Sequence, residues 1–124
     1  TRTDSLSWKD KSWVLGIQVG GKSKAYDWIQ LKKRRVLMDE LASVPVVIAI
    51  APDEQSFEAF KRQDNDQFIL RNDSLISSHN QYDFYGRSRD GSKLERIKAY
   101  QEFWHSWREF HPGTEVYGLE ETDE

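Results

Sequence analysis

Apolar and polar side chains alternate along residues 13–19, which is the clearest local pattern in the chain. The apolar positions of this stretch are Trp13, Leu15, Ile17 and Val19. A period of two predicts a β-strand with one strongly apolar face. Gly20-Gly21 follows at once and tolerates the positive φ angles of a tight turn, so we expect an antiparallel hairpin with a second strand over residues 22–26.

The longest apolar run of the chain extends from Val44 to Ile50 and is rich in β-branched residues. Such a run predicts a strand that is buried on both faces. Pro45 cannot donate a backbone hydrogen bond, so we place it at the beginning of this strand. Before it we expect a short helical turn at residues 28–31, a basic corner at Lys32-Lys33-Arg34-Arg35 and a short strand at residues 36–38.

Several short stretches of β-type composition follow. They are residues 56–62, 68–70, 75–76 and 82–85; the first also fits one face of a helix through Phe57 and Phe60, and we assign it as a strand. Turn-forming residues at 72–73 and 89–92 separate the later stretches. Many short strands at close spacing predict a mainly β, α+β domain with a small antiparallel barrel-like or sandwich-like sheet.

A different period governs residues 99–110. The aromatic side chains there recur at steps of three and four, within an arc of about 120° on a helix; they are Tyr100, Phe103, Trp104, Trp107 and Phe110. We therefore predict one C-terminal amphipathic helix packed on the sheet and ended by His111-Pro112-Gly113. A capping box of Ser92 with Glu95 would extend it backward by two turns, but Leu94 and Ile97 lie off the aromatic stripe and favour a strand. Residues 114–117 can add a last short strand.

Composition narrows the class of protein. Aromatic residues make up 13% of the 124 residues, which argues against intrinsic disorder. No apolar run reaches the roughly 18 residues of a membrane-crossing helix. Eighteen basic and 21 acidic residues give a net charge of −3, so there is no strong nucleic-acid signal. The absence of cysteine excludes disulfides, thiol catalysis and cysteine-ligated metal centres.

One domain of ordinary size is expected, over residues 11–119. Residues 1–10 are predicted to be a polar linker or tail, and residues 120–124 an acidic tail. Because Thr1 is not an initiator methionine, we expect a fragment or a processed product.

The histidines predict neither a metal site nor a bound cofactor. His105 would lie on the polar face of the predicted helix, and the six-residue step to His111 would put these two side chains on different faces. His79 follows two serines in a polar loop and is interpreted as a turn residue. The chain has no nucleophile elbow, phosphate-binding loop or dinucleotide fingerprint, so the catalytic residues, if any, are unknown.

Two carboxylate clusters, Asp53-Glu54 and Asp64-Asn65-Asp66, are interpreted as solvated loops. The second lacks the glycine and the distal glutamate of a calcium loop. The basic run at residues 32–35 has the charge to contact phosphate or anionic lipid, but we interpret it as an exposed turn.

Trp28, Trp104 and Trp107 have the ring area to stack on a sugar or a peptide, yet the helical spacing of the last two favours packing in the core. Asn72-Asp73-Ser74 matches a glycosylation acceptor, which matters only in a eukaryotic secretory context.

Read in order, the motifs resemble the bacterial domain of unknown function 3179 family. The likeness covers roughly residues 13–118. The residues that carry it are Trp13-Val14-Leu15-Gly16-Ile17, Gly21-Lys22, Ala25-Tyr26, Asp39, Val44-Pro45-Val46-Val47, Pro52, Gly86, Gly91, Leu94, Trp104, Trp107, His111-Pro112 and Thr114.

The resemblance implies a Cys-Pro-x-x-Cys motif around Pro52, and this chain departs from it. Ala51 and Glu54 occupy the two cysteine positions, so any thiol or metal chemistry of those cysteines is unavailable here. The resemblance also implies an extracytoplasmic, envelope-associated location.

These observations favour a non-catalytic β-rich binding or interaction domain of a larger bacterial protein, with a protein partner or a covalently linked neighbouring domain. The alternative is an enzyme whose acid and base groups come from loops, such as Asp53, Glu54 or His79. A third hypothesis is nucleic-acid contact through the basic corner. A deep pocket that holds His79 or Asp53 beside a second titratable group would favour the enzyme, and a shallow surface with exposed tryptophans would favour the binder.

Overall fold

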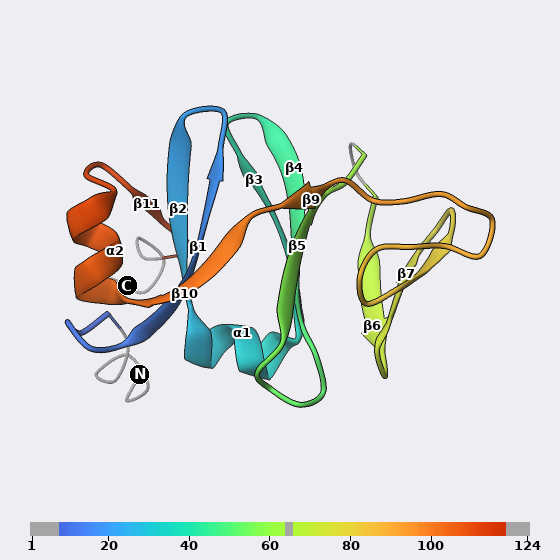
Figure 1. Cartoon of the computed structure of the whole chain (residues 1–124), viewed down its shortest axis with the longest axis horizontal. Coiled ribbons are helices and arrows are strands. Elements are labelled where there is room, and N and C mark those ends of the chain that lie inside the picture. The colour runs from blue at the N-terminus through green and yellow to red at the C-terminus, as the bar shows by residue number, and fades with distance from the viewer. Residues whose placement is uncertain (1–7, 64–65, 119–124) are drawn as a thin grey trace.

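The computed structural model describes residues 8–63 and 66–118, which form three open β-sheets and two short helices (Figure 1). The first sheet has the order β10 (Ala99–Phe103), β1 (Trp13–Val19), β2 (Lys22–Asp27), β11 (Glu115–Val116). The second has the order β3 (Val36–Leu41), β4 (Val44–Ile50), β5 (Phe57–Lys61), β9 (Arg96–Ile97). The third has the order β6 (Phe68–Arg71), β7 (Ser74–Ser77), β8 (Gln81–Asp83), and the helices are α1 (Trp28–Arg34) and α2 (Trp104–Phe110).

Strand β4 lies at the centre of the stack, and both of its faces are buried, as its apolar run predicts. Val46, Ile48 and Ile50 join a core that β1, β2 and α1 close from the other side. Val47 and Ala49 point the opposite way, into a second core that β6 and β7 cover. Figure 1 shows the resulting order of layers: α2, the first sheet, the second sheet and the third sheet.

The mainly β prediction is confirmed, and the open, stacked sheets correspond to its sandwich-like form. The β1–β2 hairpin is confirmed as well, since Val19 pairs with Lys22 across Gly20 (φ 57°) and Gly21 (φ 82°). The helical turn expected at residue 28 is α1, and the carboxylate of Asp27 caps it by accepting from Gln30 N at 3.2 Å. No helix in the described ranges has the length and apolar character needed to cross a membrane.

The C-terminal helix is shorter than predicted, because residues 99–103 form strand β10 and the helix begins at Trp104. Strand β10 pairs with β1 from Trp13↔Phe103 to Ile17↔Ala99. Without it, the hydrogen-bonding groups along one side of β1 would lack partners in a strand that is largely buried, which costs more than the helical propensity of five residues provides. Tyr100 and Phe103 are consequently exposed on β10, and Phe110, at the end of α2, is exposed as well, so these three side chains are not part of a buried stripe.

The part of the helix that remains packs on the outer face of the first sheet. Trp104 and Trp107 are buried there with Val14 and Ala25, and the Trp107 indole nitrogen donates to Thr114 Oγ1 at 3.0 Å. The indole lies directly over Gly16, where a Cβ atom would sit 2.4 Å from the ring. Residues 8–10, expected in the tail, contact this helix: Trp8 packs edge-on against Trp104, and Asp10 pairs with Arg108 at 3.0 Å.

A polar cluster joins the first two sheets. Lys24 Nζ lies 2.7 Å from Asp39 Oδ2, both side chains being mostly buried, and the hydroxyl of Tyr26 donates to the same oxygen at 2.8 Å. Burial and the negative charge of Asp39 raise the pKa of Tyr26 far above its usual range. The phenol therefore remains a neutral donor to Asp39.

We expect Trp107→Ala to lower the free energy of unfolding by about 3–5 kcal/mol, because it removes a side chain that is only 2% exposed and leaves a cavity over Gly16. Denaturant melts measure this loss. His105→Ala on the exposed side of the same helix is the control and should change stability by less than about 0.5 kcal/mol. A loss under about 1 kcal/mol for the tryptophan variant would contradict the packing of α2.

Candidate functional site

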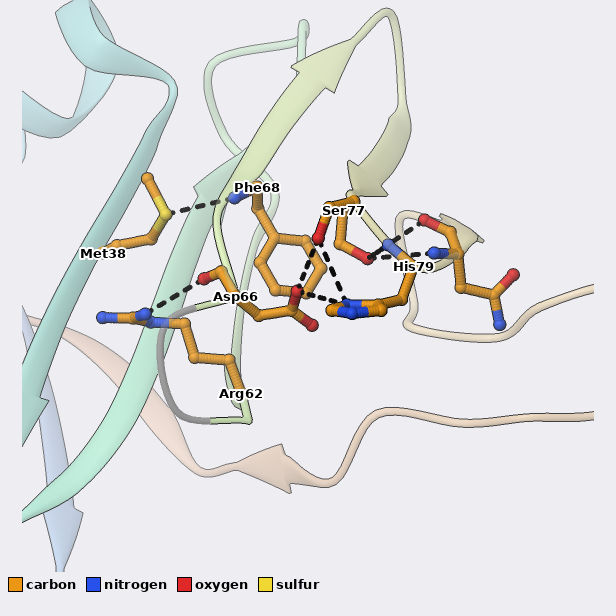
Figure 2. Close-up of polar contacts among 8 residues, drawn as sticks. Met38, Arg62, Asp66, Phe68, Ser77 and His79 are labelled. Atoms are coloured by element: carbon orange, nitrogen blue, oxygen red, sulfur yellow. Dashed lines mark hydrogen bonds and ion pairs between the residues drawn. The ribbon is translucent and has the colours of Figure 1, made fainter.

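The described part of the chain brings a serine, a histidine and an aspartate together beside the third sheet (Figure 2). His79 Nδ1 lies 2.9 Å from Asp66 Oδ1, and the hydroxyl of Ser78 lies 3.3 Å from the same oxygen and 3.2 Å from Nδ1. The sequence predicts His79 to be a turn residue and Asp66 to lie in a solvated loop; the structure brings these two residues together. Asp64 and Asn65 of the same predicted loop lie outside the described residues.

Local hydrogen bonds hold the cluster in place. Arg62 donates to Asp66 O at 3.0 Å, to Val46 O at 2.8 Å and to Asp39 O at 3.1 Å, so it ties the loop of Asp66 to the second sheet. On the other side, the hydroxyl of Ser77 accepts from the backbone amide of His79 at 3.2 Å. The turn after β7 thereby presents the imidazole to Asp66, as Figure 2 shows.

The geometry does not match that of a catalytic triad. In a triad the aspartate binds one imidazole nitrogen and the nucleophile faces the other. Here Asp66 and Ser78 both lie against Nδ1 of His79, which leaves Nε2 without a hydroxyl to activate. The imidazole is also 79% exposed, whereas the aspartate side chain is 10% exposed, so no water-excluding pocket surrounds the histidine.

A broad hollow of about 680 Å³ opens next to this cluster, between β8 and the loop that follows it. The residues that line it carry polar or charged side chains, with the aromatic ring of Tyr82 among them: Ser74, Asn80, Gln81, Tyr82, Asp83, Arg87, Ser88, Arg89 and Asp90. A volume of this size is in the range of small-molecule sites.

Hydrogen bonds to the backbone and between side chains fix the polar groups of the hollow. Asn80 Oδ1 accepts from Gln81 N and from the hydroxyl of Ser88, and its amide nitrogen donates to Asp90 Oδ2 at 3.2 Å. Asp83 accepts from the backbone amides of Tyr85 and Arg87 at 2.8 and 3.0 Å. The guanidinium of Arg89, by contrast, makes no hydrogen bond or ion pair with the described residues and is open to a ligand.

The two carboxylates of the hollow remain ionised at neutral pH. The amide of Arg87, followed by that of Tyr85, lowers the pKa of Asp83 against an opposing effect of burial. Hydrogen bonds from Ser92 similarly lower the pKa of Asp90. Neither group can donate a proton near pH 7, because a general acid needs a pKa close to the operating pH.

The carboxylates of the first predicted cluster, Asp53 and Glu54, lie away from His79 and bind other residues. Asp53 accepts from Gln55 N, Ser56 N and the Ser56 hydroxyl, each at 2.8 Å. Glu54 pairs with Arg35 at 3.1 Å. The structure thus does not bring either residue together with His79.

The other histidines form no metal centre. His105 is exposed, and the imidazole of His111 packs on Trp107 with ring centroids 3.7 Å apart. In residues 8–63 and 66–118, no three His, Asp or Glu side chains are grouped so that they could hold a metal ion.

The tryptophans considered as a stacking platform are all buried. Helical spacing predicts this for Trp104 and Trp107, and Trp28 is buried as well. Trp13 is the tryptophan that sequence reasoning misplaced. It was expected on the buried face of its strand, but its side chain is 45% exposed and stacks on Phe103 with ring centroids 4.3 Å apart. Its position at the very start of β1 was the only signal available.

Comparison with known families supplies the affiliation. The family described as "Protein of unknown function (DUF3179)" matches residues 1–114. The chain belongs to the DUF3179 family. No curated protein and no solved structure is significantly similar to this DUF3179 chain.

The two positions at which the resemblance implies cysteines are the ends of one turn in this DUF3179 chain. Glu54 N donates to Ala51 O at 2.9 Å. Arg35 donates to Ala51 O at 2.8 Å and pairs with the Glu54 carboxylate, so a guanidinium bridges both ends of the turn. The chain has no cysteine, and an ion pair holds this corner together.

The carboxyl group of Asp83 should titrate below its ordinary value of 3.8. A depressed pKa stabilises the folded state above the unfolded-state pKa, and this contribution is lost as the pH falls through the depressed value. Carboxyl-carbon NMR measures the midpoint, and Arg87→Ala should move it upward by removing a positive charge. A midpoint at or above 3.8 in the unaltered chain would contradict the hydrogen bonds to this carboxylate.

Proposed function

We propose that the chain is a non-catalytic binding domain and that its ligand is a hydroxyl-rich molecule of the saccharide type, held in the hollow beside β8. The observation that carries the proposal is the preorganised polar lining of this hollow. Asn80, Asp83 and Asp90 are each fixed by several hydrogen bonds, and Arg89 has unsatisfied donors.

The chemistry of the lining matches that of sugar hydroxyls. A hydroxyl group both donates and accepts, so a polyhydroxylated ligand needs acceptors and donors side by side. Ionised Asp83 and Asp90 supply acceptors, while Arg87 and Arg89 supply donors. The ring of Tyr82, which also lines the hollow, offers an apolar face for the sugar ring.

The geometry around His79 supports binding over catalysis. An enzyme of the loop-borne acid–base type would need a titratable pair enclosed in a pocket. Asp66 and Ser78 both contact the same nitrogen of an exposed imidazole. The arrangement therefore does not pair a nucleophile with a base oriented by a carboxylate. The lowered pKa values of Asp83 and Asp90 argue against general-acid catalysis in the hollow.

We expect neutral and uronic-acid trisaccharides, titrated into the ¹⁵N-labelled chain, to shift the amide signals of residues 80–90. Arg89→Ala should weaken binding about tenfold, since it removes charge-assisted hydrogen bonds, without changing the melting temperature. Arg71→Ala is the matched control, because Arg71 is exposed and unpaired with described residues on the nearby strand β6.

Three outcomes would contradict this function. Saccharides that leave residues 80–90 unperturbed, or equal losses in the two arginine variants, would remove the hollow as the binding site. Turnover of an ester or glycoside substrate that disappears in His79→Ala would establish the enzyme instead.

A further inference from the structure

A second surface lies near α1 and the start of β1. Figure 1 shows these elements on the side of the first sheet, away from the third sheet. This second surface is a groove of about 420 Å³ whose apolar lining comes from Trp13, Trp28 and Ile29. Lys9, Lys11 and Lys32 stand around it. We call it the lysine-rimmed groove; it shares no residue with the hollow beside β8 and does not depend on the function proposed for that hollow.

The charge of this groove differs from that of the chain as a whole, which carries a net charge of −3. None of the three lysines forms an ion pair with a described carboxylate. Elsewhere in the described ranges many basic side chains do have such partners: Lys22, Lys24, Arg35, Lys61, Arg87, Arg96 and Arg108.

One carboxylate also lines the groove, that of Asp27. It is 9% exposed and accepts from Gln30 N as the cap of α1. Three ammonium groups against one buried carboxylate give the rim a positive charge, so the complementary partner is an anion.

The apolar lining of the groove indicates a second property of the partner, an apolar side chain. Trp13 and Phe103 form a stacked pair whose side chains are 45% and 39% exposed. Exposed aromatic side chains beside a hollow are typical of an interface anchor, because they supply large contact area at low conformational cost. An apolar side chain that enters the hollow would cover Trp13 and reach the edge of Trp28.

We infer that the lysine-rimmed groove binds an acidic peptide segment of a partner protein, with one apolar side chain in the groove and carboxylates on the lysines. A concave surface with apolar lining suits a protruding side chain better than it suits the plane of a bilayer. No arginine is among the described residues that line the groove, so the bidentate fork that reads phosphate groups is absent there, while the lysines supply point charges for carboxylates.

The test uses the full chain and a fluorescein-labelled peptide of five glutamates around one phenylalanine, followed by fluorescence anisotropy. Binding should weaken as salt rises from 50 to 500 mM. Lys11→Glu and Lys32→Glu should each weaken it at least about fivefold, because an attractive contact becomes a repulsive one. Lys93→Glu makes the same change in net charge on an exposed loop away from the groove and should have little effect.

Peptide variants test the apolar anchor. Replacing the phenylalanine of the peptide by serine, or Trp13 of the chain by alanine, should each reduce affinity about tenfold, with the melting temperature of the variant as a check on folding. Equal binding of a peptide in which lysine replaces glutamate, or equal losses in all three charge variants, would overturn the inference.

The same experiments distinguish two other possible occupants of the lysine-rimmed groove. Cosedimentation with vesicles that contain anionic phospholipid, without peptide binding, would reassign the groove to a lipid surface and overturn the peptide assignment. Tighter peptide binding by a chain that ends at Gly118 would show competition from Glu120, Glu121, Asp123 and Glu124 of the chain itself, and would also overturn it.

Discussion

The burial of strand β4 on both faces is the constraint on which the rest of the structure depends. A strand with Val46, Ile48 and Ile50 on one side and Val47 and Ala49 on the other must be covered twice. The first sheet with α1 covers one side, and the hairpins of the third sheet cover the other. Neither cover can be removed without exposing the apolar side chains on that side of β4 to water, and each Å² of apolar surface so exposed costs about 25 cal/mol.

The layered order also separates the two candidate surfaces. The hollow lies in turns beyond the third sheet, and the lysine-rimmed groove lies where β1 begins and α1 follows β2. Two lining side chains also serve the interior, because Trp28 belongs to the first core and Tyr82 packs against the second. The polar and charged side chains at both places belong to neither core, so they are available for recognition.

The parts of the fold that local pattern determines were predictable from sequence. The β1–β2 hairpin follows from alternation and a glycine pair, and β4 follows from an unbroken apolar run. Residues 99–103 were assigned to the wrong element because their aromatic spacing fits a helix as well as a strand. The strand forms because residues 99–103 pair with the edge of β1, which lies over eighty residues away in the sequence. The local pattern of residues 99–103 contains no information about that pairing. Trp13 illustrates the same limit: it alternates in phase with the buried Leu15, but its side chain is exposed at the first position of β1 and stacks on Phe103.

The candidate sites were less predictable than the fold. The sequence gives no sign that Asp66 and His79 meet, because the contact depends on how Arg62 fastens one loop to the second sheet. The hollow assembles side chains from separate turns, each fixed by short-range hydrogen bonds of the Asx type. Each of those turns can be predicted from its own local sequence. The sequence does not show that they come together around one hollow.

The contact of the Trp107 indole with Gly16 has a consequence for the evolution of this fold. The two positions, far apart in sequence, compete for one volume, so neither can be exchanged independently. A methyl group at position 16 becomes tolerable only after the ring at position 107 has been replaced by something smaller. Related sequences should therefore show covariation between these positions, and substitutions at the pair should be non-additive in their effect on folding.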